Sequence, residues 1–198
     1  MALNKEPILK KCKALGISPM VMGVAKETKR DPKANVRKKE SEYARQLKEK
    51  QKLKFIYGVL EKQFRHIYEK AEKMEGQAGA NLLTLLELRL DNVAYRMGLS
   101  TTRREARQIV DHKHVLVNGK CVNIPSYRIS AGDKIEIKEK SKSLQGFKNI
   151  VEANAGVVTP AWMESDVETL TGTVKELPLR EQIDVPVNDT LIVELYSK

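Results

Sequence analysis

Apolar residues recur every three or four positions along the first half of the chain, and this spacing predicts helices. The longest series predicts a helix that begins at Ser41 and ends near Gly76. Gly58 is a weak point in it, because glycine costs about 1 kcal/mol relative to alanine inside a helix. A short helix is predicted over residues 2–14. Residues 16–39 lack a hydrophobic period, and this absence predicts an extended basic segment that becomes ordered mainly on binding a partner.

The middle of the chain contains two further predicted helices. Asn81 is a good residue to cap the first of them, and Gly98 fits the position just after its end. The sequence Thr102-x-x-Glu105 has the spacing of a capping box, which predicts a second helix that reaches Asp111. The side chains that this second helix turns inward are Ala106, Ile109 and Val110.

A β-hairpin is predicted at residues 115–121, where the apolar period changes to two. The Asn118-Gly119 pair fits the tight two-residue turn, because that turn needs a positive φ at both positions. Cys121 then lies in the returning strand and is interpreted as a small buried side chain. The alternation at residues 135–137 predicts a further strand.

Beyond this strand the pattern is weaker. Residues 138–148 are basic and are predicted to be exposed, a short helix is predicted over residues 147–155, and a strand pair is predicted around residues 167–174. The apolar segment 189–196 is predicted to dock on the helical part of the protein. Its spacing leaves open whether it is a helix or a strand.

Charge is unevenly distributed along the 198 residues, whose net charge is +10. Residues 1–80 hold 20 Lys and Arg against 10 Asp and Glu, residues 81–150 hold 13 against 7, and residues 151–198 hold 3 against 9. The first three quarters are therefore basic and the last quarter is acidic. A basic surface attracts polyanions, but by itself it does not choose between RNA, DNA and an anionic membrane.

Other features narrow the class of protein. No apolar run approaches the roughly 20 residues that span a bilayer, and the N-terminus lacks the apolar stretch of a secretory signal. Cys12 and Cys121 are the only cysteines, which argues against a disulfide framework. The sequence contains no GxGxxG, P-loop, HExxH or Ser/His/Asp pattern. We expect a soluble intracellular protein that binds a polyanion, has no small-molecule substrate or cofactor, and is not an enzyme.

Several stretches of the chain together carry a resemblance to one family. They are Ser41-Glu42-Tyr43, Glu49-Lys50-Gln51-Lys52, Ile56-Tyr57-Gly58-Val59-Leu60-Glu61-Lys62-Gln63-Phe64, Arg89-Leu90-Asp91-Asn92-Val93, Val122-Asn123-Ile124-Pro125-Ser126-Tyr127 and Leu191-Ile192-Val193-Glu194-Leu195-Tyr196-Ser197-Lys198. In order from about Ser41 to Lys198, the chain resembles the bacterial-type small-subunit ribosomal protein S-four family. The module 89–137 alone is also similar to an RNA-binding module of tyrosyl-tRNA synthetases, pseudouridine synthases and a heat-shock RNA-binding protein.

The resemblance implies an α+β fold, in which an N-terminal helical domain receives an inserted RNA-binding module of helices packed on a small antiparallel sheet. The chain then divides into three parts. These are a basic arm (1–40), a helical domain (41–87, with 183–198 packing back on it) and an α+β domain (88–182) that contains the module 89–137.

The resemblance also implies a structural constituent of the small ribosomal subunit in the cytoplasm. Family members bind 16S rRNA early and directly at a junction of several helices, which nucleates assembly of the subunit body. They neighbour protein S-five at an interface tied to translational accuracy, and the stretch matching Arg37-Lys38-Lys39 lies near the path by which mRNA enters. Two alternatives stay open: an RNA-modifying or aminoacylating enzyme built on the same module, and a free-standing RNA chaperone.

Basic residues in three places are the predicted RNA contacts. Arginine suits this role because its planar guanidinium can grip a phosphate through two donors, and the alternative is a solvated helix face paired with neighbouring carboxylates. The predicted contacts on the short helix and hairpin are Arg103, Arg104, Arg107, Lys113, His114 and Lys120. Those on the long helix are Arg45, Lys48, Lys52 and Arg65. Those in the arm are Lys29, Arg30, Arg37, Lys38 and Lys39.

The N-terminus departs from the family in one respect. Many relatives carry N-terminal cysteines suited to zinc, whereas residues 1–40 contain only Cys12, and a structural zinc site needs about four ligands. His112 and His114 lack a third ligand and are weak evidence for a metal. We therefore predict that no metal is bound.

Two sets of polar residues are not expected to touch RNA. Asp91 and Asn92 are interpreted as capping or buried polar residues. The acidic end, residues 164–194, is expected to face a basic neighbouring protein, consistent with an S-five interface.

Overall fold

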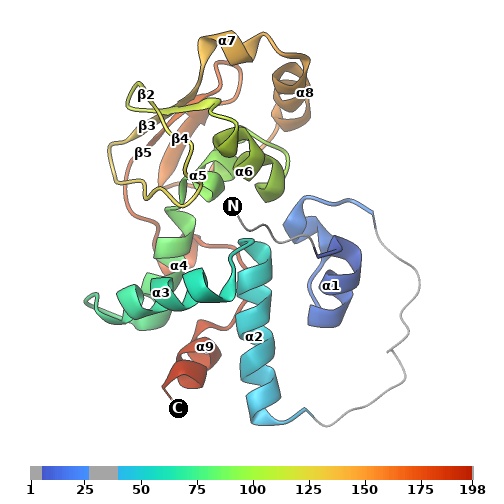
Figure 1. The fold of residues 1–198 in the computed structure, drawn as a ribbon, viewed down its shortest axis with the longest axis vertical. Helices are drawn as coiled ribbons and strands as arrows, with labels where there is room; N and C mark the ends of the chain where they lie inside the picture. The colour runs from blue at the N-terminus through green and yellow to red at the C-terminus, as the bar shows by residue number, and fades with distance from the viewer. Residues whose placement is uncertain (1–5, 27–39, 198) are drawn as a thin grey trace. The chain divides into compact units, whose positions relative to one another are not determined.

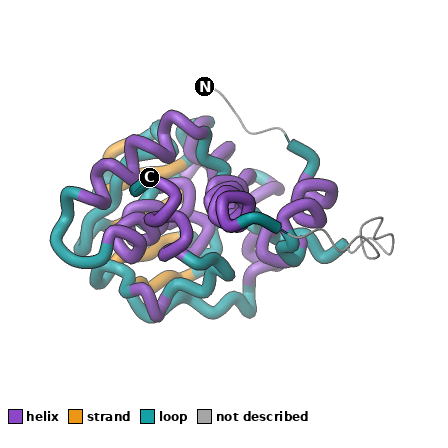
Figure 2. The backbone as a smooth tube through the Cα atoms, turned by 90° about the horizontal axis from the view of Figure 1, so that it is seen from below, coloured by secondary structure: helices purple, strands orange, loops and turns teal. Residues whose placement is uncertain are grey.

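The computed structural model describes residues 6–26 and 40–197. Their helices and their small antiparallel sheet confirm the predicted α+β class. The chain forms two compact units, Met1–Leu82 with Asp184–Lys198, and Leu83–Ile183. The first unit is helical, and the strands all belong to the second (Figure 1 and Figure 2).

Helices build the first unit, and the C-terminal helix is one of them. The elements are α1 (Ile8–Leu15), the 3-10 helix η1 (Pro19–Met22), α2 (Glu42–Ile56), α3 (Glu61–Glu72), the first part of α4 (Ala78–Glu87) and α9 (Asp189–Tyr196). Helix α9 packs along α2, where Gln46 Nε2 donates to Glu194 Oε2 at 3.0 Å and the Asn188 N–H donates to Glu49 Oε2 at 3.1 Å. The predicted docking of segment 189–196 is confirmed, and the segment is a helix.

Residues 16–26 form a compact turn around η1. The Ser18 hydroxyl caps η1 by accepting a hydrogen bond from the Met20 N–H at 3.3 Å. Ile17 and Met22 are buried. The prediction of an extended segment is therefore wrong for this part of residues 16–39, because two apolar side chains fold back into the unit. Residues 27–39 lie outside the described residues.

The helix predicted over residues 41–76 is in fact two helices. Helix α2 ends at Ile56, and Gly58 adopts a φ of +62°, a left-handed conformation that favours glycine. The Val59 N–H donates to the Lys54 carbonyl at 3.0 Å and closes the last turn of α2. The chain then leaves in a new direction as α3, so the weak point at Gly58 is a complete break.

The helix predicted between Asn81 and Gly98 also divides, into α4 and α5 (Leu90–Arg96). The backbone between them is extended and pairs with a distant loop. The Leu90 N–H donates to the Tyr127 carbonyl, and the Ile129 N–H donates to the Leu88 carbonyl, both at 2.9 Å. The single-helix prediction fails here because these tertiary hydrogen bonds replace helical ones.

Asn81 has a different role from the predicted N-cap. It lies inside α4, and its Nδ2 donates to the carbonyl oxygens of Ala71, Met74 and Glu75 at 3.2, 3.4 and 3.1 Å. The last carbonyls of a helix have no partner within the helix. Asn81 therefore caps the C-terminal end of α3.

The second unit contains a five-stranded antiparallel sheet in the order β2-β1-β3-β5-β4. Its strands are β1 (Val115–Val117), β2 (Lys120–Cys121), β3 (Lys134–Ile137), β4 (Met163–Asp166) and β5 (Thr171–Val174). Asn118 and Gly119 have φ values of 49° and 75°, which confirms the predicted hairpin turn. Cys121 is exposed, because β2 is an edge strand, so its predicted burial is wrong.

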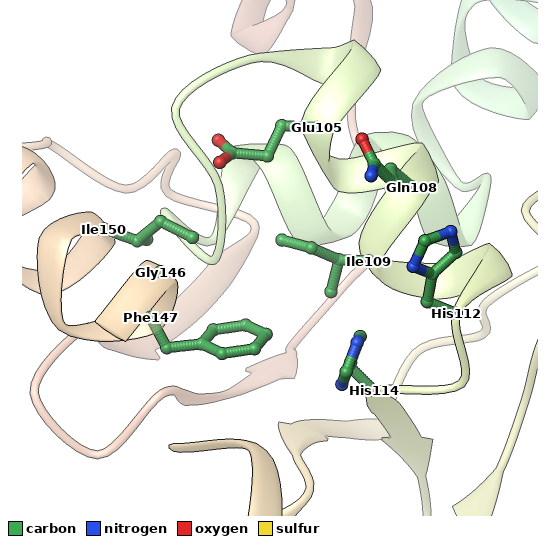
Figure 3. Close-up of a pocket in the computed structure, with 8 residues that line it drawn as sticks. All are labelled: Glu105, Gln108, Ile109, His112, His114, Gly146, Phe147 and Ile150. Atoms are coloured by element: carbon green, nitrogen blue, oxygen red, sulfur yellow. The ribbon is translucent and has the colours of Figure 1, made fainter. Parts of the chain in front are cut away.

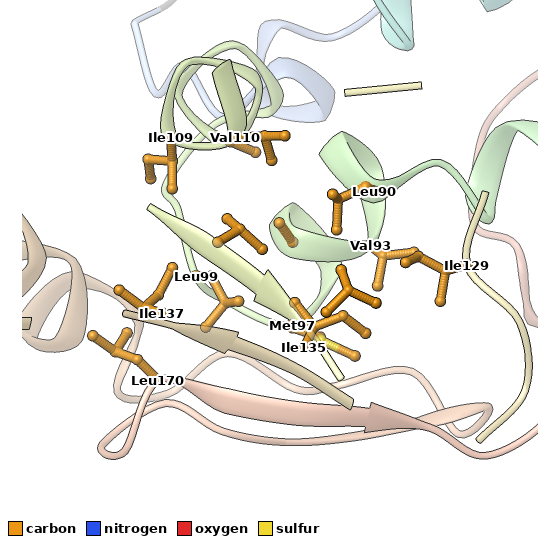
Figure 4. Packing of buried hydrophobic residues seen from close by; sticks show 14 of the residues in the cluster. Leu90, Val93, Met97, Leu99, Ile109, Val110, Ile129, Ile135, Ile137 and Leu170 are labelled. Carbon is orange, nitrogen blue, oxygen red and sulfur yellow. The ribbon is translucent and has the colours of Figure 1, made fainter. Parts of the chain in front are cut away.

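Helices α5 and α6 (Arg103–Asp111) pack on this sheet around one apolar core (Figure 4). Along β3, Ile135 and Ile137 are buried and Lys134 is exposed, as the alternation of apolar and polar residues predicts. The core side chains from α5, α6 and the hairpin include Leu90, Val93, Met97, Ala106, Ile109, Val110, Val115 and Val117. The module that carries the predicted contacts is therefore fixed to the sheet by burial of apolar surface.

The remaining elements of the second unit lie close to the predicted ones but not at the same bounds. The segment predicted to be exposed at 138–148 contains a short helix, α7 (Glu139–Lys142), and α8 (Gln145–Asn154) follows it. The predicted strand pair is β4 and β5, and β4 begins at Met163, directly after the buried Trp162. A short 3-10 helix, η2 (Arg180–Gln182), ends the unit.

Candidate nucleic-acid interface

Helix α6, which carries three of the predicted arginines, begins with a well-defined cap. Thr102 Oγ1 accepts a hydrogen bond from the Glu105 N–H at 3.2 Å. The Glu105 carboxylate reaches one residue further back than in a capping box, and accepts from the N–H and the hydroxyl of Thr101, both at 2.7 Å. The first turn of α6 is therefore fixed from both sides, which gives the arginines a rigid base.

The three arginines of α6 lie in two different environments. Arg103 Nε donates to Asn92 Oδ1 at 2.8 Å, and its guanidinium lies 4.4 Å from the centre of the Tyr95 ring. Arg107 Nη1 lies 3.6 Å from the Asp91 carboxylate. Arg104 is exposed. The structure therefore ties Arg103 and Arg107 to α5 and turns Arg104 toward solvent.

Two buried carboxylates hold a second pair of arginines beside them. Asp91 accepts from Arg89 Nε and Nη2 at 3.0 and 2.7 Å, and Glu87 accepts from Arg96 Nε and Nη2 at 3.1 and 2.8 Å. The side chains of Asp91 and Glu87 are 7% and 1% exposed. Paired, two-donor contacts of this kind offset the cost of burying charge. Asp91 is thus a buried polar residue, as its place in an apolar stretch predicts.

Glu87, Arg89 and Arg96 are not among the residues predicted from the sequence to belong to the site. The available signal was their position among buried leucines, because a charged residue in an apolar series needs an opposite charge nearby. Helical spacing did not reveal the pairs, since Arg89 lies in the extended break between α4 and α5.

The cations around the hairpin are partly exposed and partly turned inward. Lys113 and Lys120 are exposed. His114 Nδ1 lies 2.9 Å from Ser141 Oγ, and the His114 ring meets the Phe147 ring edge-on at 5.6 Å. Burial, followed by the nearby His112 and Lys138, lowers the pKa of His114. The lowered pKa disfavours the positively charged form of His114.

A pocket of about 180 Å³ lies between α6 and α8 (Figure 3). Apolar side chains of Ile109, Phe147 and Ile150 line it together with the polar side chains of Glu105 and Gln108. The imidazole side chains of His112 and His114 also line it. The pocket is a recess beside the cationic helix, with the composition of a packing or docking surface.

The predicted contacts on α2 and α3 are all engaged with nearby carboxylates. Ion pairs join Arg45 to Glu42 at 3.7 Å, Lys48 to Glu40 at 3.1 Å and Arg65 to Glu69 at 3.3 Å, and a fourth joins Lys52 to Glu49. Exposed ion pairs contribute only about 0–1 kcal/mol, so a phosphate can compete for the cations of the first three pairs. The Lys52–Glu49 pair is more shielded, with side chains 17% and 13% exposed. The predicted contacts in the arm lie outside the described residues; they are Lys29, Arg30, Arg37, Lys38 and Lys39.

Residues 6–26 and 40–197 offer neither a metal site nor a membrane-spanning helix. Within these residues, no group of three or more His, Cys, Asp or Glu side chains is arranged to hold a metal ion. Within the same residues, no helix has the length and apolar character needed to cross a bilayer.

Comparison with known proteins gives two family matches and many full-length relatives. The sequence model described as the ribosomal protein S4/S9 N-terminal domain matches residues 4–87, and the S4 domain matches residues 88–135. Proteins named small ribosomal subunit protein uS4 are 63% identical in Lachnoclostridium phytofermentans, 60% in Lachnospira eligens and 49% in Fusobacterium nucleatum. Each of these alignments covers 100% of both chains.

Proposed function

The chain belongs to the uS4 family of small ribosomal subunit proteins, and from this membership we propose that it binds 16S rRNA directly and early in assembly. Binding at a junction of several RNA helices would nucleate assembly of the subunit body. The family consists of structural proteins of the cytoplasmic ribosome, so the role is that of a structural constituent and not of an enzyme. The alternative of an RNA-modifying enzyme is thereby set aside.

The observation that carries this proposal is the set of exposed cations on the second unit. Arg104 on α6, Lys113 at its end and Lys120 on the hairpin all lie within residues 88–135, which match the S4 domain. Cations on rigid elements suit structured RNA, because the deep major groove of an A-form helix hides the base edges and leaves phosphates and shape to be recognised.

We extend the proposal to the other predicted contacts. Arg103 and Arg107 would meet phosphates from the positions in which α5 holds them. The cations of α2, α3 and the arm would add phosphate contacts without reading sequence. In the arm, Arg37, Lys38 and Lys39 would also lie near the path by which mRNA enters.

The acidic end, residues 164–194, is proposed to face protein S-five and to contribute to translational accuracy through that contact. Residues 151–198 hold 9 Asp and Glu against 3 Lys and Arg, which disfavours contact with RNA. Leu177 and Leu179 are 48% and 62% exposed, next to the exposed Glu176 and Glu181. Apolar side chains between carboxylates are suited to a basic protein partner.

The test of rRNA binding compares one specific RNA with one non-specific RNA. The purified chain is titrated against a transcript of the 5′ domain of 16S rRNA and against random-sequence duplex RNA at several salt concentrations. We expect a dissociation constant in the nanomolar range for the transcript and a steep loss of affinity with salt. Equal affinity for both RNAs would contradict the proposal.

A second measurement separates an integral subunit component from a loosely bound chaperone. Small subunits that contain the chain are sedimented through a high-salt cushion. An integral component stays with the particle, because many contacts must break together. Release into the supernatant would favour the chaperone.

A further inference from the structure

One buried amide connects the end of α4 to an arginine of α6. Asn92 is 3% exposed and lies between Glu87 and Arg103. We propose that Asn92 is a positioning residue, which sets the Arg103 guanidinium for contact with an RNA phosphate. The inference rests on the proposed function, because it concerns how the same surface is arranged before RNA binds.

The orientation of the Asn92 amide is fixed by the groups on each side of it. Its Nδ2 donates to Glu87 Oε2 at 2.5 Å and to the Glu87 carbonyl at 3.2 Å. A carboxylate and a carbonyl only accept, so the NH₂ end must face Glu87. The Oδ1 end then faces Arg103 Nε at 2.8 Å, and a guanidinium only donates. Reversing the amide would lose all three hydrogen bonds.

Glu87 is itself held in place, which makes the start of this connection rigid. Its two carboxylate oxygens accept from Arg96 at 2.8 and 3.1 Å, and its side chain is 1% exposed. Arg96 is 12% exposed. Charge-assisted hydrogen bonds among buried groups are strong and resist rearrangement.

Arg103 is restrained in two directions at the other end. Asn92 holds its Nε, and the Tyr95 ring lies against the guanidinium at 4.4 Å. An arginine that is free in solution loses the freedom of several rotatable bonds when it binds a phosphate. An arginine fixed beforehand loses less, so binding is tighter.

A purely structural role for the same contacts makes a different prediction. Asn92 also joins α5 to α6, so its loss lowers stability under either explanation. If Asn92 acts only on the fold, its removal affects RNA binding in the same way whether or not Arg103 is present. If it acts through Arg103, its effect on RNA binding disappears when Arg103 is absent.

The experiment is a double-mutant cycle in the full chain. Dissociation constants for the 5′-domain transcript are measured for Asn92→Ala, Arg103→Ala and the double variant. We expect Arg103→Ala to weaken binding about tenfold, as loss of one charge-assisted hydrogen bond to phosphate implies. Asn92→Ala should weaken it less, and the double variant should match Arg103→Ala.

A matched control separates stability from affinity. Asn81→Ala removes another internally bonded amide, which belongs to the first unit, and should lower the unfolding temperature without weakening transcript binding. If circular dichroism shows that Asn92→Ala does not fold, Asn92→Ser is used instead. Serine keeps a small polar group at this buried position, whereas alanine keeps none.

The outcomes distinguish this inference from the proposed function. Equal losses of affinity from Asn92→Ala in the presence and absence of Arg103 would overturn the positioning role. So would unchanged affinity in Asn92→Ala or in Arg103→Ala. The proposed function is judged separately, by the preference of the unaltered chain for the transcript over random duplex RNA.

Discussion

At the scale of single residues, the basic side chains of the second unit differ in how their charge is held. Arg89 and Arg96 each bind a buried carboxylate through two nitrogens, whereas Arg104, Lys113 and Lys120 are exposed. Removing an arginine of the first kind takes the two-donor partner away from a buried carboxylate, which is strongly destabilising. Removing a cation of the second kind changes mainly the attraction for phosphate. Stability and RNA affinity should therefore respond to different substitutions.

Arg104→Ala should change the salt dependence of RNA binding more than the stability of the chain. Each cation that neutralises a phosphate contributes about 0.7 to 0.9 to the slope of log affinity against log salt. We expect the slope for the 5′-domain transcript to fall by about that amount, with an unchanged unfolding temperature. Lys175→Ala is the control, since Lys175 is exposed but pairs with Glu164 at 3.1 Å in the acidic quarter. Identical slopes for the two variants would argue against Arg104 as a contact.

Tyr196 should make the chain less stable in alkaline solution. Its ring stacks on Tyr68 at 4.3 Å, and burial, the Glu61 charge and the hydrogen bond to Glu61 raise the pKa of Tyr196. A raised pKa in the folded state means that this contribution to stability is fully present below the ordinary pKa of tyrosine, about 10, and is lost as pH rises above it. The free energy of unfolding, measured with urea, should therefore fall less between about pH 9 and 11 in Tyr196→Phe than in the unaltered chain. Parallel curves for the two proteins would show that Tyr196 does not carry the effect.

At the scale of elements, the break between α2 and α3 depends on the backbone of one residue. Gly58 has a φ of +62°, and a Cβ there would meet no atom within 4 Å. The cost of Gly58→Ala is therefore backbone strain rather than a clash. We expect a loss of about 1 to 2 kcal/mol in the free energy of unfolding by urea.

A matched glycine separates this strain from a general effect of adding a methyl group. Gly146 lies in α8 without a positive φ, and its Cβ would also meet no atom within 4 Å. Gly146→Ala should be neutral or stabilising by up to about 1 kcal/mol, because alanine favours a helix. A loss of stability in Gly146→Ala as large as that in Gly58→Ala would contradict the argument.

Features that neighbouring residues determine could be predicted from the sequence, and features that distant residues determine could not. The Asn118-Gly119 turn and the cap at Thr102 depend on residues two or three positions apart. The break after Leu88 depends on a loop about 40 residues later, and helical spacing gives no sign of it. The same holds for the site: the exposure of Arg104 follows from helical spacing, whereas the link from Asn92 to Arg103 needs the α5–α6 packing.

At the scale of the whole molecule, the acidic quarter is built into both units. It provides β4 and β5 to the sheet of the second unit and α9 to the first. Strand β5 lies between β3 and β4, so a truncation of residues 172–198 would remove an inner strand as well as the helix that packs on α2. A loss of translational accuracy in such a truncation would reflect unfolding of the chain rather than loss of a protein contact. Point substitutions on the exposed part of this quarter are therefore the informative test.

Reversing two exposed charges should alter decoding without altering rRNA binding. Glu176 and Glu181 are exposed on either side of Leu177 and Leu179, on the surface proposed to face S-five. In the double variant that combines Glu176→Lys with Glu181→Lys, repulsion from a basic partner should weaken the contact with S-five. We expect stop-codon read-through by subunits containing the variant to change in a translation assay. Affinity for the 5′-domain transcript should stay within about twofold, since surface substitutions away from a contact cost less than about 0.5 kcal/mol.

Glu152→Lys, an exposed charge reversal on α8, is the control and should leave read-through unaltered. If the double variant instead lost rRNA affinity and left read-through unaltered, the acidic quarter would belong to the RNA-binding surface and not to a protein interface.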